Sequence, residues 1–120
     1  MKTGIIVFGH GSSVASANDA VRVVAAKAAI EAGWELYEVA FLECAPLLDE
    51  AVPKLAAAGA EDILVVPYFL TLGIHLQRDL PKIVERLSRE HRLPIRVTEP
   101  LDGHAALTQI LADRAAGARQ

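Results

Sequence analysis

The stretch GIIVFGHGSS, residues 4–13, decides the fold class of this chain. It opens with an apolar run and then places His10 between two glycines. A second run of the same kind, ILVVPYFL (residues 63–70), leads into TLGIH (residues 71–75), which ends at His75. Continuous apolar strands are typical of parallel sheets that are buried on both faces. Ligands bind beyond the carboxyl ends of such strands, so two histidines delivered there indicate a metal or proton-transfer site.

The rest of the chain alternates strand and helix patterns, which predicts four strand–helix units. The expected strands are residues 4–8, 35–41, 62–66 and 95–98. The expected helices run from near Ser16 to Gly33, from Pro46 to Gly59, from Asp79 to about His91, and from about Gly103 to Ala115, with residues 71–78 as a loop.

Local signals refine the expected helices. Ser16 followed by Asp19 is a variant of the capping pattern, and Pro53 is expected to kink or split the second helix. Pro81 suits the first turn of a helix that begins at Asp79. Apolar spacing assigns two inward faces, made of Leu80, Ile83, Val84 and Leu87 in the third helix and of Ala106, Leu107, Ile110 and Leu111 in the fourth.

The alternation predicts one α/β domain, residues 1–120, with an open four-stranded parallel sheet and helices on both faces. The two most apolar strands belong at the centre, and the alternating strand 95–98 belongs at an edge. The resulting order is 2-1-3-4, half of a flavodoxin-like sheet. Its switch point lies between the first and third strands. We therefore expect His10 and His75 to meet at one crevice.

Bulk composition narrows the function classes. The 120 residues carry a net charge of −3 without a polybasic run, so neither nucleic acid nor a membrane surface is an expected partner. A single cysteine, Cys44, excludes an internal disulfide and fits a reducing compartment. No apolar run approaches the ~20 residues of a transmembrane helix, and the N-terminus has the pattern of a strand rather than a signal peptide. We expect a cytoplasmic protein.

Each histidine can be interpreted either as a structural or surface residue or as a functional one. Imidazole binds late divalent metals and accepts protons near neutral pH. Alone, His10 could equally be a turn histidine bonded to backbone, or part of an anion nest formed by residues 9–12. Alone, His75 would be a surface loop residue. Their pairing at one crevice favours function.

Other candidates near the sheet edge keep two interpretations each. Glu43 is either a helix-terminus carboxylate or a third group of the site. Cys44 is a packing residue more readily than a ligand, and His104 suits capping or solvent. Arg78 and Lys82 either attract carboxylates of a ligand or serve solubility. Nucleophile-elbow, Walker, dinucleotide and structural-zinc motifs are absent from the sequence.

With these residues placed, the chain resembles the short, single-lobe sirohydrochlorin chelatases of the CbiX type, which are class II tetrapyrrole chelatases. The resemblance covers nearly the whole chain. It rests on GHGS (residues 9–12), FLE (41–43) before Pro46, VVPYFL (65–70), Gly73, His75, Asp79 and Pro81, and less closely on PLDGH (100–104).

The resemblance implies a lyase that inserts a divalent metal, Co²⁺, Fe²⁺ or Ni²⁺, into sirohydrochlorin for cobalamin or sirohaem-type biosynthesis. It implies that His10 and His75 bind the metal and help remove the pyrrole protons, and that Glu43 assists. The metal is then a substrate, and no organic cofactor is expected. Longer relatives carry two lobes, so a single lobe implies a homodimer that rebuilds the two-lobe cleft.

Three alternatives stay open at this point. A non-catalytic metal or tetrapyrrole carrier would keep the same ligands without turnover. A phosphoryl-transfer enzyme with His10 as nucleophile is weaker, because Phe8 and Gly9 occupy the place of the arginine that would hold phosphate. A flavodoxin-like interaction module would make the two edge histidines coincidental.

Overall fold

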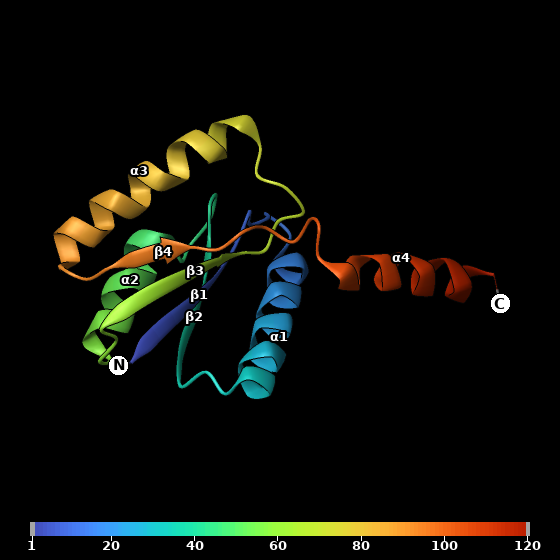
Figure 1. Cartoon of the computed structure of the whole chain (residues 1–120), viewed down its shortest axis with the longest axis horizontal. Coiled ribbons are helices and arrows are strands. Elements are labelled where there is room, and N and C mark those ends of the chain that lie inside the picture. Colours follow the sequence, from blue (N-terminus) through green and yellow to red (C-terminus); the bar gives the residue numbers. More distant parts are fainter. Residues whose placement is uncertain (1, 120) are drawn as a thin grey trace.

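A computed structural model describes residues 2–119, in which one parallel sheet carries all four strands (Figure 1). The elements are β1 (Thr3–Gly9), α1 (Ala15–Ala32), β2 (Leu36–Phe41), α2 (Leu48–Ala57), β3 (Asp62–Pro67), α3 (Ile74–His91), β4 (Ile95–Val97) and α4 (Ala105–Ala118). Their spatial order is β2-β1-β3-β4. The predicted order is confirmed, and each strand begins and ends within one residue of its expected bounds.

The strand register brings the carboxyl ends of three strands to one level. Gly9 at the end of β1 pairs with Phe41 at the end of β2. On the other side of β1, Phe8 pairs with Pro67 at the end of β3. The residues that follow these strands therefore leave the sheet together, at the edge where His10 was expected.

One face of the sheet holds the main core. Ile6 and Phe8 of β1 point to this face with Ile63 and Val65 of β3, and all four are almost fully buried. Helices α2 and α3 cover them with a set of buried side chains: Leu48, Val52, Leu55, Leu76, Leu80, Val84 and Leu87. Burial of each such side chain contributes about 1.5–3 kcal/mol, so this face fixes the position of α3 and of the residues at its start.

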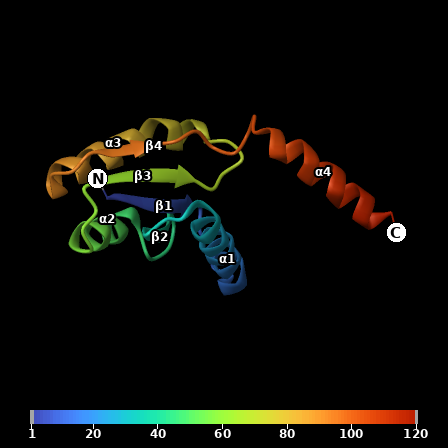
Figure 2. The same cartoon turned by 60° about the horizontal axis from the view of Figure 1, so that its bottom comes forward.

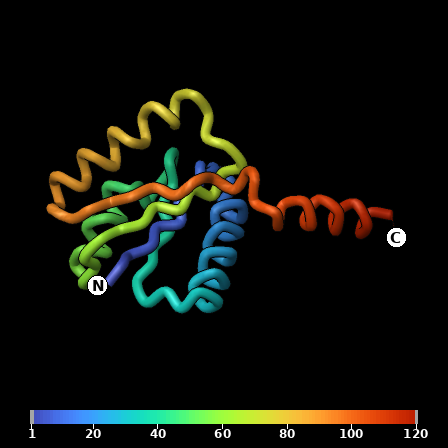
Figure 3. Tube along the Cα trace, in the orientation of Figure 1, coloured from blue at the N-terminus to red at the C-terminus, as the bar shows by residue number. Residues whose placement is uncertain are grey.

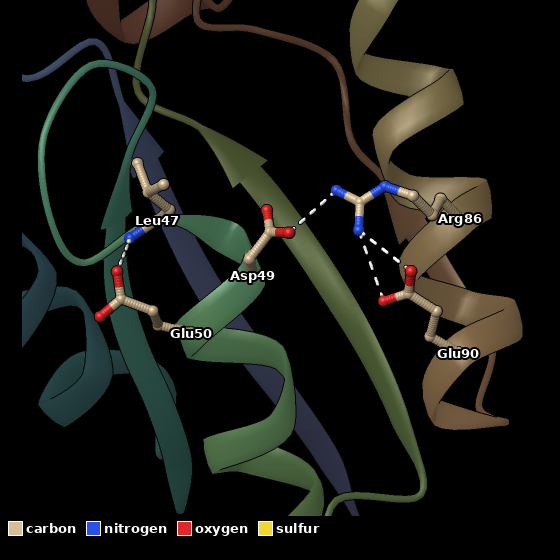
Figure 4. Close-up of polar contacts among 5 residues, drawn as sticks. All are labelled: Leu47, Asp49, Glu50, Arg86 and Glu90. Carbon is tan, nitrogen blue, oxygen red and sulfur yellow. Dashed lines mark hydrogen bonds and ion pairs between the residues drawn. The ribbon is translucent and has the colours of Figure 1, made fainter.

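Polar contacts at the surface join the same two helices (Figure 4). Arg86 of α3 donates to the Asp49 carboxylate of α2 at 2.9 Å and to Glu90 at 3.2 Å. Hydrogen bonds with Asp49 and then Glu90 raise the pKa of the Arg86 guanidinium. At the start of α2, the Leu47 N–H donates to the Glu50 carboxylate. Exposed pairs of this kind add little stability, so the position of α3 on α2 depends mainly on the buried apolar contacts.

The opposite face of the sheet is covered by α1 alone within residues 2–119. Ile5 and Val7 of β1 point to this face, and α1 buries Ala25 and Ala29 above the sheet. Helix α4 does not join α1 there. It projects from the body of the molecule in both cartoon views (Figures 1 and 2) and stands apart in the Cα trace (Figure 3).

The expected inward face of the fourth helix is therefore wrong for this chain's own sheet. None of the residues of α4 is buried, and Leu111 is 72% exposed. The residues do form a helix with this spacing, but an apolar stripe does not specify which surface it covers.

The starts of the first two helices also differ from expectation. Val14 is the N-cap of α1 and lacks a side-chain cap, and Asp19 pairs with Arg22 instead. The Ser12 hydroxyl accepts from the Val14 N–H and makes the turn before the helix. Pro46 lies before α2, because its carbonyl accepts from the Phe41 N–H and closes a turn onto β2.

The remaining differences between the expected and the observed helices involve the two prolines that lie inside α2 and α3. Helix α2 runs unbroken through Pro53 and is not split. Helix α3 begins at Ile74 rather than Asp79, so most of the expected loop 71–78 is helical. Pro81 is exposed, and the carbonyl it leaves without an N–H partner can bond water instead. Leu76, one turn before Leu80, extends the core face that was predicted to begin at Leu80.

Candidate functional site

His10 and Glu43 lie together because the backbones after β1 and β2 stay paired beyond the sheet. The Leu42 N–H donates to the Gly9 carbonyl and the Glu43 N–H donates to the His10 carbonyl, both at 3.0 Å. These bonds continue the parallel ladder past the ends of the strands. The side chains follow the backbone, so His10 Nε2 lies 3.4 Å from Glu43 Oε1. The third-group interpretation of Glu43 therefore has a direct contact in its favour.

The His10 loop is tightly packed against its neighbours. Gly11 has φ +88°, and a Cβ there would meet Cys44 Sγ at 2.8 Å and Phe41 Cβ at 3.0 Å. Asn18 of α1 holds the loop from the other side, accepting from the Ser12 N–H and donating to the Ser12 carbonyl, both at 2.9 Å. The loop is thus fixed by α1 and by the loop after β2.

The hydrogen bond of the His10 ring selects its tautomer. Nδ1 lies 3.1 Å from the Gly11 carbonyl oxygen, which can only accept. In this hydrogen bond Nδ1 carries the proton, so Nε2 of the neutral ring keeps its lone pair. That lone pair lies beside the Glu43 carboxylate. Two electron-rich atoms at this distance suit a cation or a proton between them.

His75 has the opposite arrangement. It is the second residue of α3, after the N-cap Gly73. Arg78 Nη2 lies 3.3 Å from His75 Nδ1, and a guanidinium can only donate, so Nδ1 accepts. The neutral His75 ring therefore carries its proton on Nε2 in this conformation. Arg78 also pairs with Asp79 at 3.1 Å.

A pocket of about 410 Å³ joins the two histidines. Its walls are mostly apolar and include Leu42, Phe69 and Ile83. The Phe69 ring lies edge-on to His10 with 6.4 Å between centroids, and it packs on Phe8 of β1 at 5.8 Å. The predicted meeting of His10 and His75 at one crevice is confirmed, although His75 reaches it from a helix rather than from a loop.

The remaining candidates lie outside the pocket. His104 is the N-cap of α4 and its Nδ1 accepts from the Ala106 N–H, as the capping interpretation predicted. The Cys44 sulfur lies 3.6 Å from Asn18 Nδ2, which agrees with a packing role. Among residues 2–119, histidine, cysteine and acidic side chains form no group of three that could hold a metal ion. Over the same range, no helix is long and apolar enough to cross a membrane.

Two residues contribute to the site without a clear signal in the sequence pattern. Asn18 holds the His10 loop, but a single asparagine at the start of a helix carries no periodic signal. Asp79, expected at the start of a helix, lies inside α3 and lines the pocket one turn after His75. Extending the Leu80–Val84–Leu87 spacing one turn back to Leu76 would have placed both Asp79 and His75 on the helix.

The fold and the site together define a class of protein: a half-size, flavodoxin-like α/β lobe with a histidine pair over an apolar pocket at the carboxyl edge of its sheet. The family model that matches the chain is CbiX, over residues 4–118. The chain belongs to the CbiX family.

Individual relatives agree with this assignment. The chain is 38% identical over 81 residues to the sirohydrochlorin cobaltochelatase of Methanopyrus kandleri, a match that spans 67% of this chain and 57% of that relative. The chain thus spans just over half the length of this curated relative.

Two solved structures share the fold. A crystal structure of a CbiX protein from Marinobacter aquaeolei VT8 matches with a TM-score of 0.84 and 33% identity, covering 96% of this chain and 95% of that one. The sirohydrochlorin chelatase SirB of Bacillus subtilis subspecies spizizenii, solved in complex with cobalt, matches with a TM-score of 0.76 and 26% identity. That match covers 83% of this chain but 44% of SirB.

Proposed function

We propose that this chain is a sirohydrochlorin chelatase that inserts Co²⁺ into the tetrapyrrole, with Fe²⁺ or Ni²⁺ as possible substrates of the same chemistry. One observation carries the proposal: His10 and His75 line the same apolar pocket, with Glu43 in contact with His10. The names of the cobaltochelatase relative and of the cobalt-bound SirB support it. The single free cysteine suits a cytoplasmic location.

The metal is a substrate, and the proposed entry point is the pair of His10 Nε2 and Glu43 Oε1. Both side chains are more than half exposed, so a hydrated dication can reach them from solvent. One imidazole nitrogen and one carboxylate oxygen suit Co²⁺, Fe²⁺ and Ni²⁺ alike. A site with so few donors binds the ion weakly, which suits an ion that must move on to the ring nitrogens.

Insertion releases two protons from pyrrole nitrogens as the metal–nitrogen bonds form. We assign the acceptors to the same groups, because a neutral imidazole is a competent base near neutral pH. The Nε2 lone pair of His10 can accept one proton once the ion has left it. His75 can take the second on Nδ1, after its contact with Arg78 opens.

The tetrapyrrole is proposed to lie with one face on the apolar wall of Leu42, Phe69 and Ile83. Arg78 and Lys82 of α3 are exposed at this end of the helix and suit the carboxylates of the ring. A pocket of about 410 Å³ leaves much of such a ring uncovered. A second copy would cover the other face, so we propose a homodimer, in keeping with the match to 44% of the longer SirB.

A direct assay tests the activity. The purified chain is mixed with sirohydrochlorin and, in separate anaerobic samples, with Co²⁺, Fe²⁺ or Ni²⁺, and the loss of the metal-free absorption spectrum is followed. We expect insertion to be faster than the spontaneous reaction and proportional to enzyme concentration. A rate equal to the spontaneous one with all three metals would refute the proposal.

The same assay separates the chelatase from a carrier. A chelatase metallates many equivalents of tetrapyrrole per chain. A carrier would bind one equivalent of metal or ring per site and then stop. Varying the ratio of substrate to protein from below one to well above it distinguishes the two.

A further inference from the structure

The neutral His10 ring has one proton and two acceptors for it, one on each side. The Gly11 carbonyl oxygen lies 3.1 Å from Nδ1, and the Glu43 carboxylate oxygen Oε1 lies 3.4 Å from Nε2. A neutral imidazole carries its proton on one nitrogen only, so the two acceptors compete for it. The carboxylate is the stronger acceptor in general. The carbonyl therefore keeps the proton on Nδ1 only while it is held close to that atom.

The carbonyl belongs to a peptide unit that can rotate. The Gly11 C=O and the Ser12 N–H lie in one trans peptide plane and point in opposite directions. Rotation of this plane changes ψ of Gly11 and φ of Ser12, and a residue without a Cβ restricts ψ least. A group that holds the Ser12 N–H on one side of the plane therefore aims the Gly11 carbonyl on the other side.

Asn18 of α1 is placed to do this. Its Oδ1 accepts from the Ser12 N–H and its Nδ2 donates to the Ser12 carbonyl, both at 2.9 Å and both partly shielded from solvent. Only one orientation of the side-chain amide satisfies both bonds, because its oxygen accepts and its nitrogen donates. The first bond connects α1 with the peptide plane that ends at the His10 ring.

We propose that Asn18 is a positioning residue that sets the tautomer of His10 through the Gly11–Ser12 peptide. The decisive bond runs from the Ser12 N–H to Oδ1, since this N–H shares a plane with the Gly11 carbonyl. The bond from Nδ2 to the Ser12 carbonyl belongs to the next peptide and supports the loop without acting on that plane. The proposal rests on the proposed function for the use of the Nε2 lone pair, but the tautomer is a property of the metal-free chain.

Two variants of Asn18 separate this role from general support of the loop. Asn18→Leu has nearly the same size and removes both bonds. We expect the His10 proton to move largely from Nδ1 to Nε2, where Glu43 accepts it. Asn18→Asp keeps an acceptor for the Ser12 N–H and loses only the donor, so we expect the wild-type tautomer. Both variants should lower the melting temperature, because each loses a hydrogen bond of the loop.

The matched control is Asp19→Leu, one residue further along α1. It makes a similar change at an exposed side chain whose carboxylate pairs with Arg22. Two-bond ¹H–¹⁵N spectra report the ring tautomer at about pH 8, where an ordinary imidazole is mostly neutral. A His10→Gln variant assigns the His10 signals. We expect the control to keep the wild-type pattern.

Cobalt affinity gives a second and quantitative readout. The metal binds only the ring form with a lone pair on Nε2, so the apparent dissociation constant is the intrinsic one divided by the population of that form. Co²⁺ alone is titrated into the metal-free chain at the same pH, and the broadening of the His10 signals is followed. For Asn18→Leu the constant should rise by about threefold to tenfold, by the same factor as the Nδ1–H population falls. The Asp19→Leu control should stay within about twofold.

Several results would overturn the positioning role, and one of them needs no variant at all. Wild-type His10 with its proton on Nε2 would contradict it directly. An unchanged tautomer in Asn18→Leu would contradict it too, as would the same change of tautomer in Asn18→Asp or in Asp19→Leu. Asn18→Ala, which gains helix propensity, takes the place of the leucine variant where leucine prevents folding, with the same expected result.

The tautomer and cobalt insertion are measured separately, so that the two proposals can fail separately. A tautomer that moves as expected in a chain that metallates no tetrapyrrole supports the positioning role and refutes only the proposed function. A chain that inserts cobalt, and whose tautomer is the same with and without Asn18, overturns the positioning role and leaves the function standing.

Discussion

His10 and His75 face one pocket, but the chain holds them in different ways. His10 lies in a loop whose backbone is bonded to the next loop at Leu42 and Glu43 and is held by Asn18. His75 lies at the start of a helix, and its ring contacts the exposed side chain of Arg78. One side of the site is fixed by the sheet, and the other can adjust. A fixed lone pair suits a metal ligand, whereas an adjustable ring suits a proton acceptor.

Replacing His10 or His75 by alanine gives the strongest test of the two roles, metal ligand and proton acceptor. We expect His10→Ala to lower kcat/KM for cobalt insertion by roughly 10²–10³-fold, because it removes the proposed metal ligand and the proposed base together. His75→Ala should cost roughly tenfold less, since the ligand pair at Glu43 survives. Steady-state spectroscopy measures both.

His104→Asn is the matched control for the two alanine variants, since it removes a histidine and keeps an acceptor at the N-cap of α4. It should retain insertion. A larger loss for His75→Ala than for His10→Ala would reverse the assignment of the two roles.

The fixed side is also sensitive to backbone strain. Gly11→Ala should lower the free energy of unfolding by about 2–4 kcal/mol, because the new Cβ adds the left-handed penalty to a clash with Cys44 and Phe41. Gly33→Ala carries the same penalty at φ +71° without a neighbour within 4 Å, and it should cost about 1–2 kcal/mol. Guanidinium titration measures the free energy of unfolding of both variants. Equal losses would mean that the His10 loop moves enough to accommodate the new Cβ without a clash.

The adjustable side depends on Arg78, which we regard as a positioning residue for His75. Arg78→Met keeps the length of the side chain but cannot donate to Nδ1. Without Arg78 the neutral ring can move its proton to Nδ1, which then cannot accept another, so we expect kcat to fall by about threefold to tenfold. The change in the His75 ring tautomer is followed by ¹⁵N NMR.

Arg89→Met, in the last turn of α3, is the control and should leave both readouts unchanged. A rise in KM with kcat and the tautomer preserved would show that Arg78 acts only on the carboxylates of the ring and does not position His75.

The smallest expected effect is that of Arg86→Gln, which removes the bridge from α3 to Asp49. We expect a slight loss of stability that disappears at 1 M salt, because exposed ion pairs are weak and screened. Asp49 and Glu90 raise the pKa of Arg86, so this contribution is present below that pKa and is lost only as the pH rises through it. The loss should therefore be constant between about pH 6 and 9 in thermal melts. A loss that persists in high salt would indicate packing rather than charge.

The apolarity of each strand predicted the strand order, because the most apolar strands must be buried at the centre of the sheet. The runs at residues 4–8 and 62–66 could lie only at the centre, and that placement alone brought His10 and His75 to one edge. The His10–Glu43 contact follows from the same register, since parallel strands that end together continue their pairing into the loops.

The misses have physical causes as well. Pro81 indicated a helix start, but an exposed proline costs a helix one hydrogen bond and does not end it. The apolar stripe of α4 follows helical spacing, yet such a stripe does not specify the surface that it covers, and none of the residues of α4 is buried. Asn18 acts through two bonds to a single loop residue, a role that leaves no mark on sequence periodicity.

Phe69 has a consequence for how the site and the C-terminal segment influence each other. Its ring lies edge-on to His10, and its carbonyl accepts from the Leu101 N–H of the segment that leads to α4. Binding of a ligand in the pocket and a movement of the segment before α4 would thus act on the same residue, and coupling of this kind is reciprocal. By whatever factor a change in this segment tightens the binding of a ligand, the ligand must favour that change by the same factor. The ligand concentration would then help to set the position of the segment that leads to α4.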